Sequence, residues 1–268
     1  MKILFIGDIF SQTGIRAIKN ELPKVKKKYN IDFVIANAEN VTNCSGLSLE
    51  HYNELISYGI DFFTMGNHTW KQNDIKKILE NKNIIRPANI LLDHKYNRYG
   101  YGSRIIYLNG CSIRITNLLG LSVRFNNIQT NPFLYLKNLI SYEETTDFHI
   151  IDFHAETTSE KNALFFAFKG KISAIIGTHS HIQTADERIR MNTAYITDVG
   201  STGSTDGIIG ANGEEIVKKY MNQIDHYSIT DQGGNYQFCA VVLDLDTNSK
   251  KVKDIKRIYI YETNAQDL

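Results

Sequence analysis

Short apolar runs alternate with helically spaced apolar residues in the first third of the chain. Three of these runs are typical of buried strands, at residues 3–6, 33–38 and 62–65. Between the first two, Ile15, Ile18 and Leu22 repeat at helical spacing. Pro23 is expected to break or kink this helix, and a second helix is expected to end at Gly59. Alternating strands and helices predict parallel strand pairing with right-handed crossovers.

The middle and the end of the chain carry the patterns of antiparallel hairpins. Two apolar segments flank Asn109-Gly110, which is a strong signal for a hairpin turn. A second hairpin is predicted where residues 236–245 alternate, turn and return over residues 252–261. The other predicted elements are helices at residues 131–141 and 159–168 and strands at residues 149–153 and 173–177.

These elements predict an α/β fold in which two sheets pack face to face with helices outside, a four-layer α/β/β/α sandwich. No linker-like composition, long charge block or internal repeat divides the sequence. We therefore expect one domain over residues 1–268.

The composition is that of an ordinary globular protein, and it excludes several kinds of partner. A net charge of +1 supplies no extended positive field, so we expect no stable nucleic-acid partner and a small anionic substrate instead. Cys44, Cys111 and Cys239 form no CxxC pair, as is typical of buried thiols in a reducing compartment. No apolar run approaches the ~18 residues of a membrane span. The sequence therefore predicts a cytoplasmic protein with no membrane partner.

Polar side chains that can bind metals follow the ends of five predicted strands. They are Asp8, Glu39, Asn40, Asn67, His68, His154, His179 and His181. In α/β sheets, ligands normally bind at the carboxyl ends of the strands. Taken singly, these residues are ambiguous, because an aspartate can cap a helix and two nearby histidines can be ordinary loop residues. Their joint occurrence, each at a strand end, indicates a metal site.

The order of these residues resembles that of the calcineurin-like metallophosphoesterases, which is Asp-x-His, Gly-Asp, Gly-Asn-His, a lone His and Gly-His-x-His. This chain departs from it in three places, with Phe10 for the first histidine, Glu39-Asn40 for Gly-Asp, and GTHSH at 177–181. These departures resemble a narrower family, the YmdB-like phosphodiesterases. The matching runs span nearly the whole chain: ILFIGD (3–8), AEN (38–40), TMGNHTW (64–70), RPAN (86–89), IDFHAETTSEK (151–161), GTHSHIQTAD (177–186) and AYITDVG (194–200).

The resemblance implies a dinuclear metal centre. The implied ligands are Asp8, Glu39, Asn40 and His181 for one metal, and Glu39, Asn67, His154 and His179 for the other. Two cations ~3.5–4 Å apart need a shared anionic ligand to offset their repulsion, and Glu39 is implied in that role. Because only Asp8 and Glu39 are anionic, the cluster stays positive and attracts phosphate. The absence of cysteine ligands argues against a closed structural zinc site.

The resemblance also implies an activity, the hydrolysis of 2′,3′-cyclic nucleotides to 3′-nucleotides. A water bridging the two metals would lose a proton near neutral pH and attack phosphorus in line. His68, beside Asn67, is the implied proton donor to the leaving oxygen. Two divalent or mixed-valence transition metal ions are expected, iron first, with manganese and zinc as alternatives. The resemblance further suggests a homo-oligomer.

Two other interpretations remain open. The same metal centre could serve a phosphatase or an RNA-directed phosphodiesterase, since nothing in the sequence identifies a base pocket. A metal-loaded regulatory scaffold with vestigial hydrolysis is an interpretation of a different class, and the intact Asn67-His68 pair argues against it. Asp198 and Asp206, in a segment rich in Gly, Thr and Ser, could support the site from behind.

Overall fold

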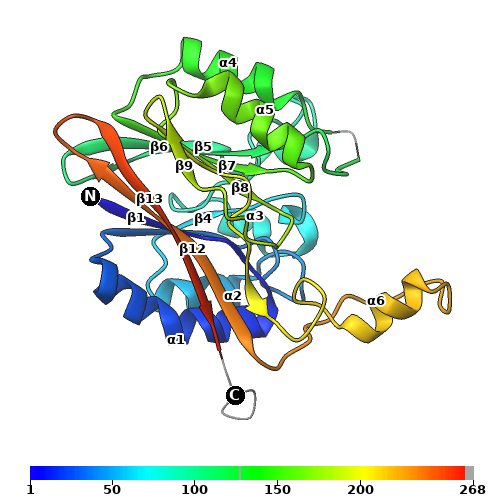
Figure 1. Ribbon diagram of the computed structural model, residues 1–268. Coiled ribbons are helices and arrows are strands. Elements are labelled where there is room, and N and C mark those ends of the chain that lie inside the picture. The colour runs from blue at the N-terminus through cyan, green and yellow to red at the C-terminus, as the bar shows by residue number, and fades with distance from the viewer. Residues whose placement is uncertain (127, 263–268) are drawn as a thin grey trace.

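The computed structural model describes residues 1–126 and 128–262, so the predicted domain 1–268 includes residues 127 and 263–268, which lie outside the described residues. Its strands form two mixed sheets that pack face to face, and helices cover both outer faces (Figure 1). The predicted α/β/β/α sandwich is therefore confirmed. No helix in the described part of the chain is long and apolar enough to cross a membrane.

The first sheet combines the two ends of the chain. In spatial order its strands are β2 (Asp8–Ile9), β11 (Ser201–Ser204), β12 (Tyr236–Asp246), β1 (Lys2–Ile6), β3 (Phe33–Asn37) and β4 (Phe62–Thr64), with β13 (Lys251–Tyr261) paired to β12. β1, β3 and β4 run parallel, as their alternation with helices predicts. β12 lies antiparallel to β1 and forms the predicted hairpin with β13.

The second sheet comes from the middle of the chain. Its spatial order is β5 (Ser103–Leu108), β6 (Cys111–Leu119), β7 (Phe148–His154), β8 (Ala174–Thr178), β10 (Thr193–Ile196) and β9 (Arg188–Arg190). The four central strands are parallel and the two edge strands are antiparallel. Asn109 and Gly110 both have positive φ, the conformation that a tight hairpin turn between β5 and β6 requires.

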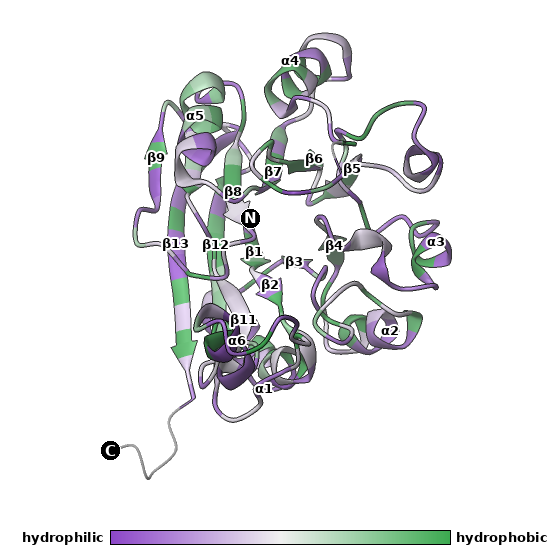
Figure 2. Cartoon of the chain, turned by 90° about the vertical axis from the view of Figure 1, so that its right-hand side faces the viewer, coloured by the Kyte–Doolittle hydropathy of each residue, from purple (hydrophilic) through white to green (hydrophobic). Residues whose placement is uncertain are grey.

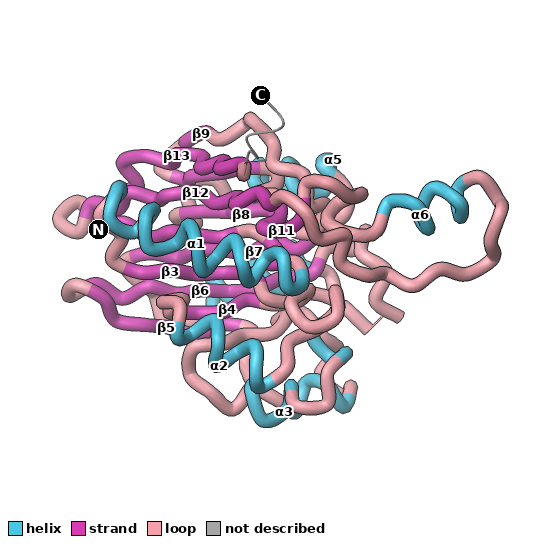
Figure 3. The backbone as a smooth tube through the Cα atoms, turned by 90° about the horizontal axis from the view of Figure 1, so that it is seen from below, coloured by secondary structure: helices cyan, strands magenta, loops and turns pink. Residues whose placement is uncertain are grey.

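Helices cover the outer faces of the two sheets (Figures 2 and 3). Those outside the first sheet are α1 (Ser11–Tyr29), α2 (Leu49–Ser57) and α3 (Ile75–Ile78), and those outside the second are α4 (Pro132–Tyr142) and α5 (Thr158–Phe168). Two 3-10 helices, η1 (Thr69–Lys71) and η2 (Lys95–Arg98), lie in the connections. α6 (Gly213–Tyr220) lies on an arm that projects from the body (Figure 3).

Alternation along the strands builds the layers. On β1, Leu4 and Ile6 pack against the helices of the first sheet, whereas Ile3 and Phe5 pack between the two sheets. Of the two outcomes expected at Pro23, a break does not occur, because α1 continues to Tyr29, and a kink stays a prediction. Apolar residues on both sides of Pro23 are buried in the same core cluster, and this packing outweighs the one backbone hydrogen bond that proline cannot make.

Candidate metal centre

The ends of five strands bring all eight predicted site residues together. Glu39 and Asn40 follow β3, Asn67 and His68 follow β4, and His154 is the last residue of β7. Asp8, His179 and His181 complete this set, from the segments that follow β1 and β8. Each of the eight contacts at least one other member through a side-chain or backbone polar atom.

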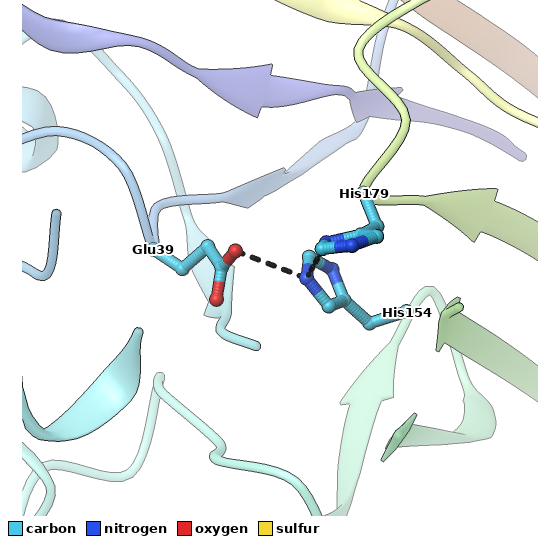
Figure 4. Close-up of side chains that lie close together, drawn as sticks. All are labelled: Glu39, His154 and His179. Atoms are coloured by element: carbon cyan, nitrogen blue, oxygen red, sulfur yellow. Dashed lines mark hydrogen bonds and ion pairs between the residues drawn. The ribbon is translucent and has the colours of Figure 1, made fainter. Parts of the chain in front are cut away.

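Three side chains converge on the Nε2 atom of His154. This atom lies 3.0 Å from Glu39 Oε1, 3.1 Å from Asn67 Oδ1 and 3.0 Å from His179 Nδ1. Ligand atoms of Glu39, His154 and His179 all lie within 4.8 Å of one another (Figure 4). Each of the four atoms can offer a lone pair, and lone pairs that face one another repel unless a positive charge lies among them. The arrangement therefore has the chemistry of a cation site.

A buried chain of hydrogen bonds orients His154. The Thr178 hydroxyl donates to Asp152 Oδ1 at 2.6 Å, so its oxygen is free to accept from His154 Nδ1 at 2.9 Å. This contact places the proton on Nδ1 and leaves Nε2 as the ligand atom. Asn37 Nδ2 donates to Asp152 from the other side at 3.0 Å. Sequence reasoning missed Asn37 and Asp152, although Asp152 lies two residues before His154 on the same side of β7, and Asn37 ends β3 two residues before Glu39.

His179 and His181 are each also held by a contact of the ring nitrogen that faces away from the centre. His179 Nε2 lies 2.8 Å from Glu156 Oε2, which leaves Nδ1 directed at His154. His181 Nδ1 donates to the Ile209 carbonyl at 3.0 Å, which leaves Nε2 directed at the cluster. Sequence reasoning gave Glu156 and Ile209 no role at the site.

Asp8, Asn40 and His181 form a second group beside the first. Asp8 Oδ2 accepts from the His179 backbone N–H at 3.1 Å, whereas the buried Oδ1 atom has no hydrogen-bond partner among the described residues. Asn40 Nδ2 lies 3.2 Å from His181 Nε2 and 3.4 Å from Glu39 Oε1. Asn40 thus presents its amide NH₂ to the predicted ligands of the first metal, and its oxygen reaches a cation between them only if the amide turns over.

His68 lies next to both groups and is about a third exposed. Its backbone N–H donates to Glu39 Oε2 at 2.8 Å, and its Nδ1 lies 2.7 Å from Asn40 Oδ1. The side chain is 31% exposed, whereas that of Glu39 is 1% exposed. His68 is therefore more open to a molecule arriving from solvent than Glu39 or than His179, whose side chain is 20% exposed.

Burial and mutual charge shift the pKa values within the cluster. Burial raises the pKa of Asp8. Burial also tends to raise that of Glu39, but the charge and hydrogen bond of His154, with help from His68 and His179, lower the pKa below its ordinary value. Burial tends to lower the pKa of His154, but Glu39 and then Asp8 raise it to about 9. Burial and the nearby His154 lower the pKa of His179 to about 3. The cluster thus favours one positive charge at its centre.

Gly66 leaves room for such a charge. A Cβ atom on Gly66 would lie 2.5 Å from His154 Nε2 and closer still to Glu39 Oε2. Only glycine therefore permits the backbone to pass this close to the converging ligand atoms. Carboxylate, amide and imidazole donors together suit iron, manganese or zinc, and the residues present fit a metal centre.

The sandwich and its cluster of carboxylate, amide and imidazole groups define a class of enzyme. The chain is a metallophosphoesterase, a hydrolase of phosphoric esters. The model of the YmdB-like protein family matches residues 4–258, and the chain belongs to this family.

Several known proteins are similar to this chain over nearly its whole length. The chain is 41% identical over 263 residues to the 2′,3′-cyclic-nucleotide 2′-phosphodiesterase of Bacillus subtilis, covering 97% of each protein. It superposes with a TM-score of 0.95 on a structure described as a novel phosphatase from Mycoplasma pneumoniae, with 42% identity and coverage of 99% and 95%. A hypothetical protein from Thermus thermophilus gives a TM-score of 0.88 and 31% identity, covering 98% of this chain and 100% of that one.

Proposed function

We propose that the chain is a dinuclear metal-dependent phosphodiesterase that hydrolyses 2′,3′-cyclic nucleotides to 3′-nucleotides. The observation that carries the proposal is the convergence of Glu39, Asn67 and His179 on His154 Nε2, next to a second group of potential ligands. The name of the Bacillus subtilis relative, a 2′,3′-cyclic-nucleotide 2′-phosphodiesterase, supports the substrate.

Glu39 is the residue proposed to join the two metal sites. Its Oε1 atom lies 3.0 Å from His154 Nε2 in one group and 3.4 Å from Asn40 Nδ2 in the other. Two divalent cations held there would lower the pKa of a bound water towards neutrality and withdraw charge from the phosphoryl oxygens. Iron is the metal we propose, with manganese and zinc as alternatives that the same donors accept.

His68 is the proposed proton donor to the leaving oxygen. His68 Nδ1 lies 2.7 Å from Asn40 Oδ1, an acceptor, so Nδ1 carries a proton. As proton donor, His68 must also carry a proton on Nε2, the nitrogen not engaged by Asn40, so that giving this proton to the leaving oxygen leaves a neutral imidazole. Because the backbone N–H of His68 is fixed on Glu39, the ring is held beside the place where phosphate would bind. The proposed hydrolysis needs no side chain as nucleophile, because a metal-bound water would attack the phosphorus.

A panel of three substrates tests the proposal. The purified chain, reconstituted with Fe²⁺ or Mn²⁺, is expected to have a higher kcat/KM for 2′,3′-cyclic AMP than for 3′,5′-cyclic AMP or AMP. A chelator is expected to abolish turnover, and restored metal to recover it. A clear preference for AMP would identify a phosphatase instead, and full activity after removal of metal would contradict the metal mechanism.

The homo-oligomer, the cytoplasmic location and the single domain stay predictions. Analytical ultracentrifugation of the purified chain tests the first of these. A strictly monomeric chain at all concentrations would contradict it.

A further inference from the structure

Lys161 and Asp198 form a buried ion pair behind the candidate metal centre. Lys161 Nζ lies 2.6 Å from Asp198 Oδ2, and each side chain is 1% exposed. Removing two charges from water costs free energy that a buried pair seldom returns as stability. A pair buried this completely, next to a candidate active site, therefore points to a role other than holding the fold together.

Asp198 holds the loop that carries two of the proposed ligands. Its Oδ2 accepts from the Ser180 backbone N–H at 3.0 Å and from the Ser180 hydroxyl at 2.7 Å, and its Oδ1 accepts from the Gly200 N–H at 2.8 Å. Ser180 lies between His179 and His181, whose φ values are 96° and 66°. Residues with side chains rarely adopt such conformations, and they persist only where the surroundings fix them. The Asp198 carboxylate provides that fixation.

Lys161 connects this loop to the segment that carries His154. It lies on α5, which begins four residues after His154 at the end of β7. Its aliphatic stem passes against Gly177, where a Cβ would lie 3.1 Å from Lys161 Cδ and would collide with the Thr197 carbonyl. The ion pair thus ties together the two segments that supply three of the proposed imidazole ligands.

We propose that Asp198 is a positioning residue of the metal centre. Its carboxylate sets the directions of His179 and His181 through Ser180, and Lys161 balances its charge inside the protein. This assignment rests on the proposed function, because it assumes that these histidines bind metal.

Asp198→Asn tests the assignment with almost no change of shape. An asparagine has one oxygen and one NH₂ group, so it cannot accept from Ser180 and Gly200 at once. We expect its affinity for Mn²⁺ to fall about 10–100-fold, the usual cost of losing a residue that orients a ligand. Ser180→Ala removes the hydroxyl contact but keeps the backbone one, so its loss should be smaller.

The double variant Lys161→Met/Asp198→Asn separates positioning from simple stabilisation. Neither charge is then buried without its partner, so thermal stability should recover relative to Asp198→Asn. The contact with either Ser180 or Gly200 is still lost, so Mn²⁺ affinity should stay low. Lys250→Met is a matched control, because Lys250 pairs with Asp147 at 3.4 Å on the surface.

The measurements are equilibrium dialysis with Mn²⁺ alone, the low-temperature electron paramagnetic resonance signal of coupled Mn²⁺ pairs, and thermal unfolding, all on the full chain. Weakened Mn²⁺ binding in Asp198→Asn and in the double variant, with unchanged binding in Lys250→Met, supports the assignment. Normal binding in Asp198→Asn, or recovery of binding together with stability in the double variant, overturns it. A wild-type chain that binds no Mn²⁺ overturns the metal centre itself and the assignment with it.

Discussion

Replacing Gly66 with alanine puts a single methyl group where the proposed ligand atoms converge. The new Cβ would lie 2.5 Å from His154 Nε2 and 2.6 Å from Glu39 Cδ. Gly66 does not have a left-handed φ, so alanine adds no backbone strain there. The methyl group is therefore the whole perturbation, and its effects can be traced to the two side chains that it meets.

The magnitude follows from these distances. Ordinary packing contacts begin near 3.4 Å, so Glu39 and His154 must each retreat by about 1 Å. Overpacking of this kind costs about 1–3 kcal/mol, and alanine returns about 0.4–1 kcal/mol by restricting the unfolded chain. We expect the free energy of unfolding to fall by roughly 1–2 kcal/mol. A displacement of about 1 Å at the ligands should lower turnover by on the order of 10²-fold.

Metal content, turnover and stability are measured on the same preparation to test this prediction. Elemental analysis after saturation with metal should show that the Gly66→Ala variant retains less metal than wild type. Circular dichroism should show that it still folds. Gly213→Ala is the matched control, because its Cβ would meet nothing nearer than Ile208 Cγ1 at 3.5 Å. A Gly66→Ala variant with full metal content and near-normal turnover would refute the convergence of ligands beside Gly66.

Three further predictions follow from the site and from one buried histidine. His68→Ala should keep its metals but lose roughly 10²–10⁴-fold in turnover of 2′,3′-cyclic nucleotides. The loss on bis-nitrophenyl phosphate should be much smaller, because its leaving group needs no proton. Equal losses on both substrates would contradict proton donation by His68. Glu39→Ala and Asn67→Ala should each lose metal and most activity while keeping the fold, as judged by elemental analysis and circular dichroism; full metal content in either would remove that residue from the ligand set. Burial, and then the charge of Arg114, lower the pKa of His149 to about 3. The unfolded chain therefore binds a proton at this histidine once the pH falls below about 6.5, before the folded chain does. As a result, folding stability declines with falling pH until about pH 3. Because the ring is partly exposed, this loss is at most about 2 kcal/mol at pH 5, and denaturant unfolding of His149→Asn should show a shallower pH dependence than wild type.

Local sequence patterns were enough to predict most of the fold. The continuous apolar run at residues 3–6 predicted a buried strand, and in β1 Ile3 and Phe5 pack between the sheets while Leu4 and Ile6 pack against the helices. The helix α6 on the projecting arm escaped prediction because its eight residues are too short a run for a clear helical period, and only Ile216 among them is buried. Tertiary packing also overrode the local signal at Pro23, where burial on both sides sustains the helix.

The candidate site was predictable to the extent that its residues follow strand ends. What could not be predicted is which partners fix those residues, because they lie far along the chain. Asn37 meets Asp152 across 115 positions and Lys161 meets Asp198 across 37, and no periodicity links either pair. The direction of the Asn40 amide depends on atoms of His68 and His181, so it too exists only in the folded chain.

The features that break local rules gather at one edge of the sandwich. His179 and His181 have left-handed backbones, Asp8 Oδ1 is buried without a hydrogen-bond partner among the described residues, and Gly66 occupies a position where any side chain would collide with Glu39 and His154. Each feature costs folding free energy on its own. All of them serve one geometry, since each directs a lone pair towards the same small volume or keeps that volume open. A protein selected only for stability would have no reason to place these unfavourable features together. A metal held there would offset their cost, because a ligand that binds only the folded chain adds its binding free energy to stability.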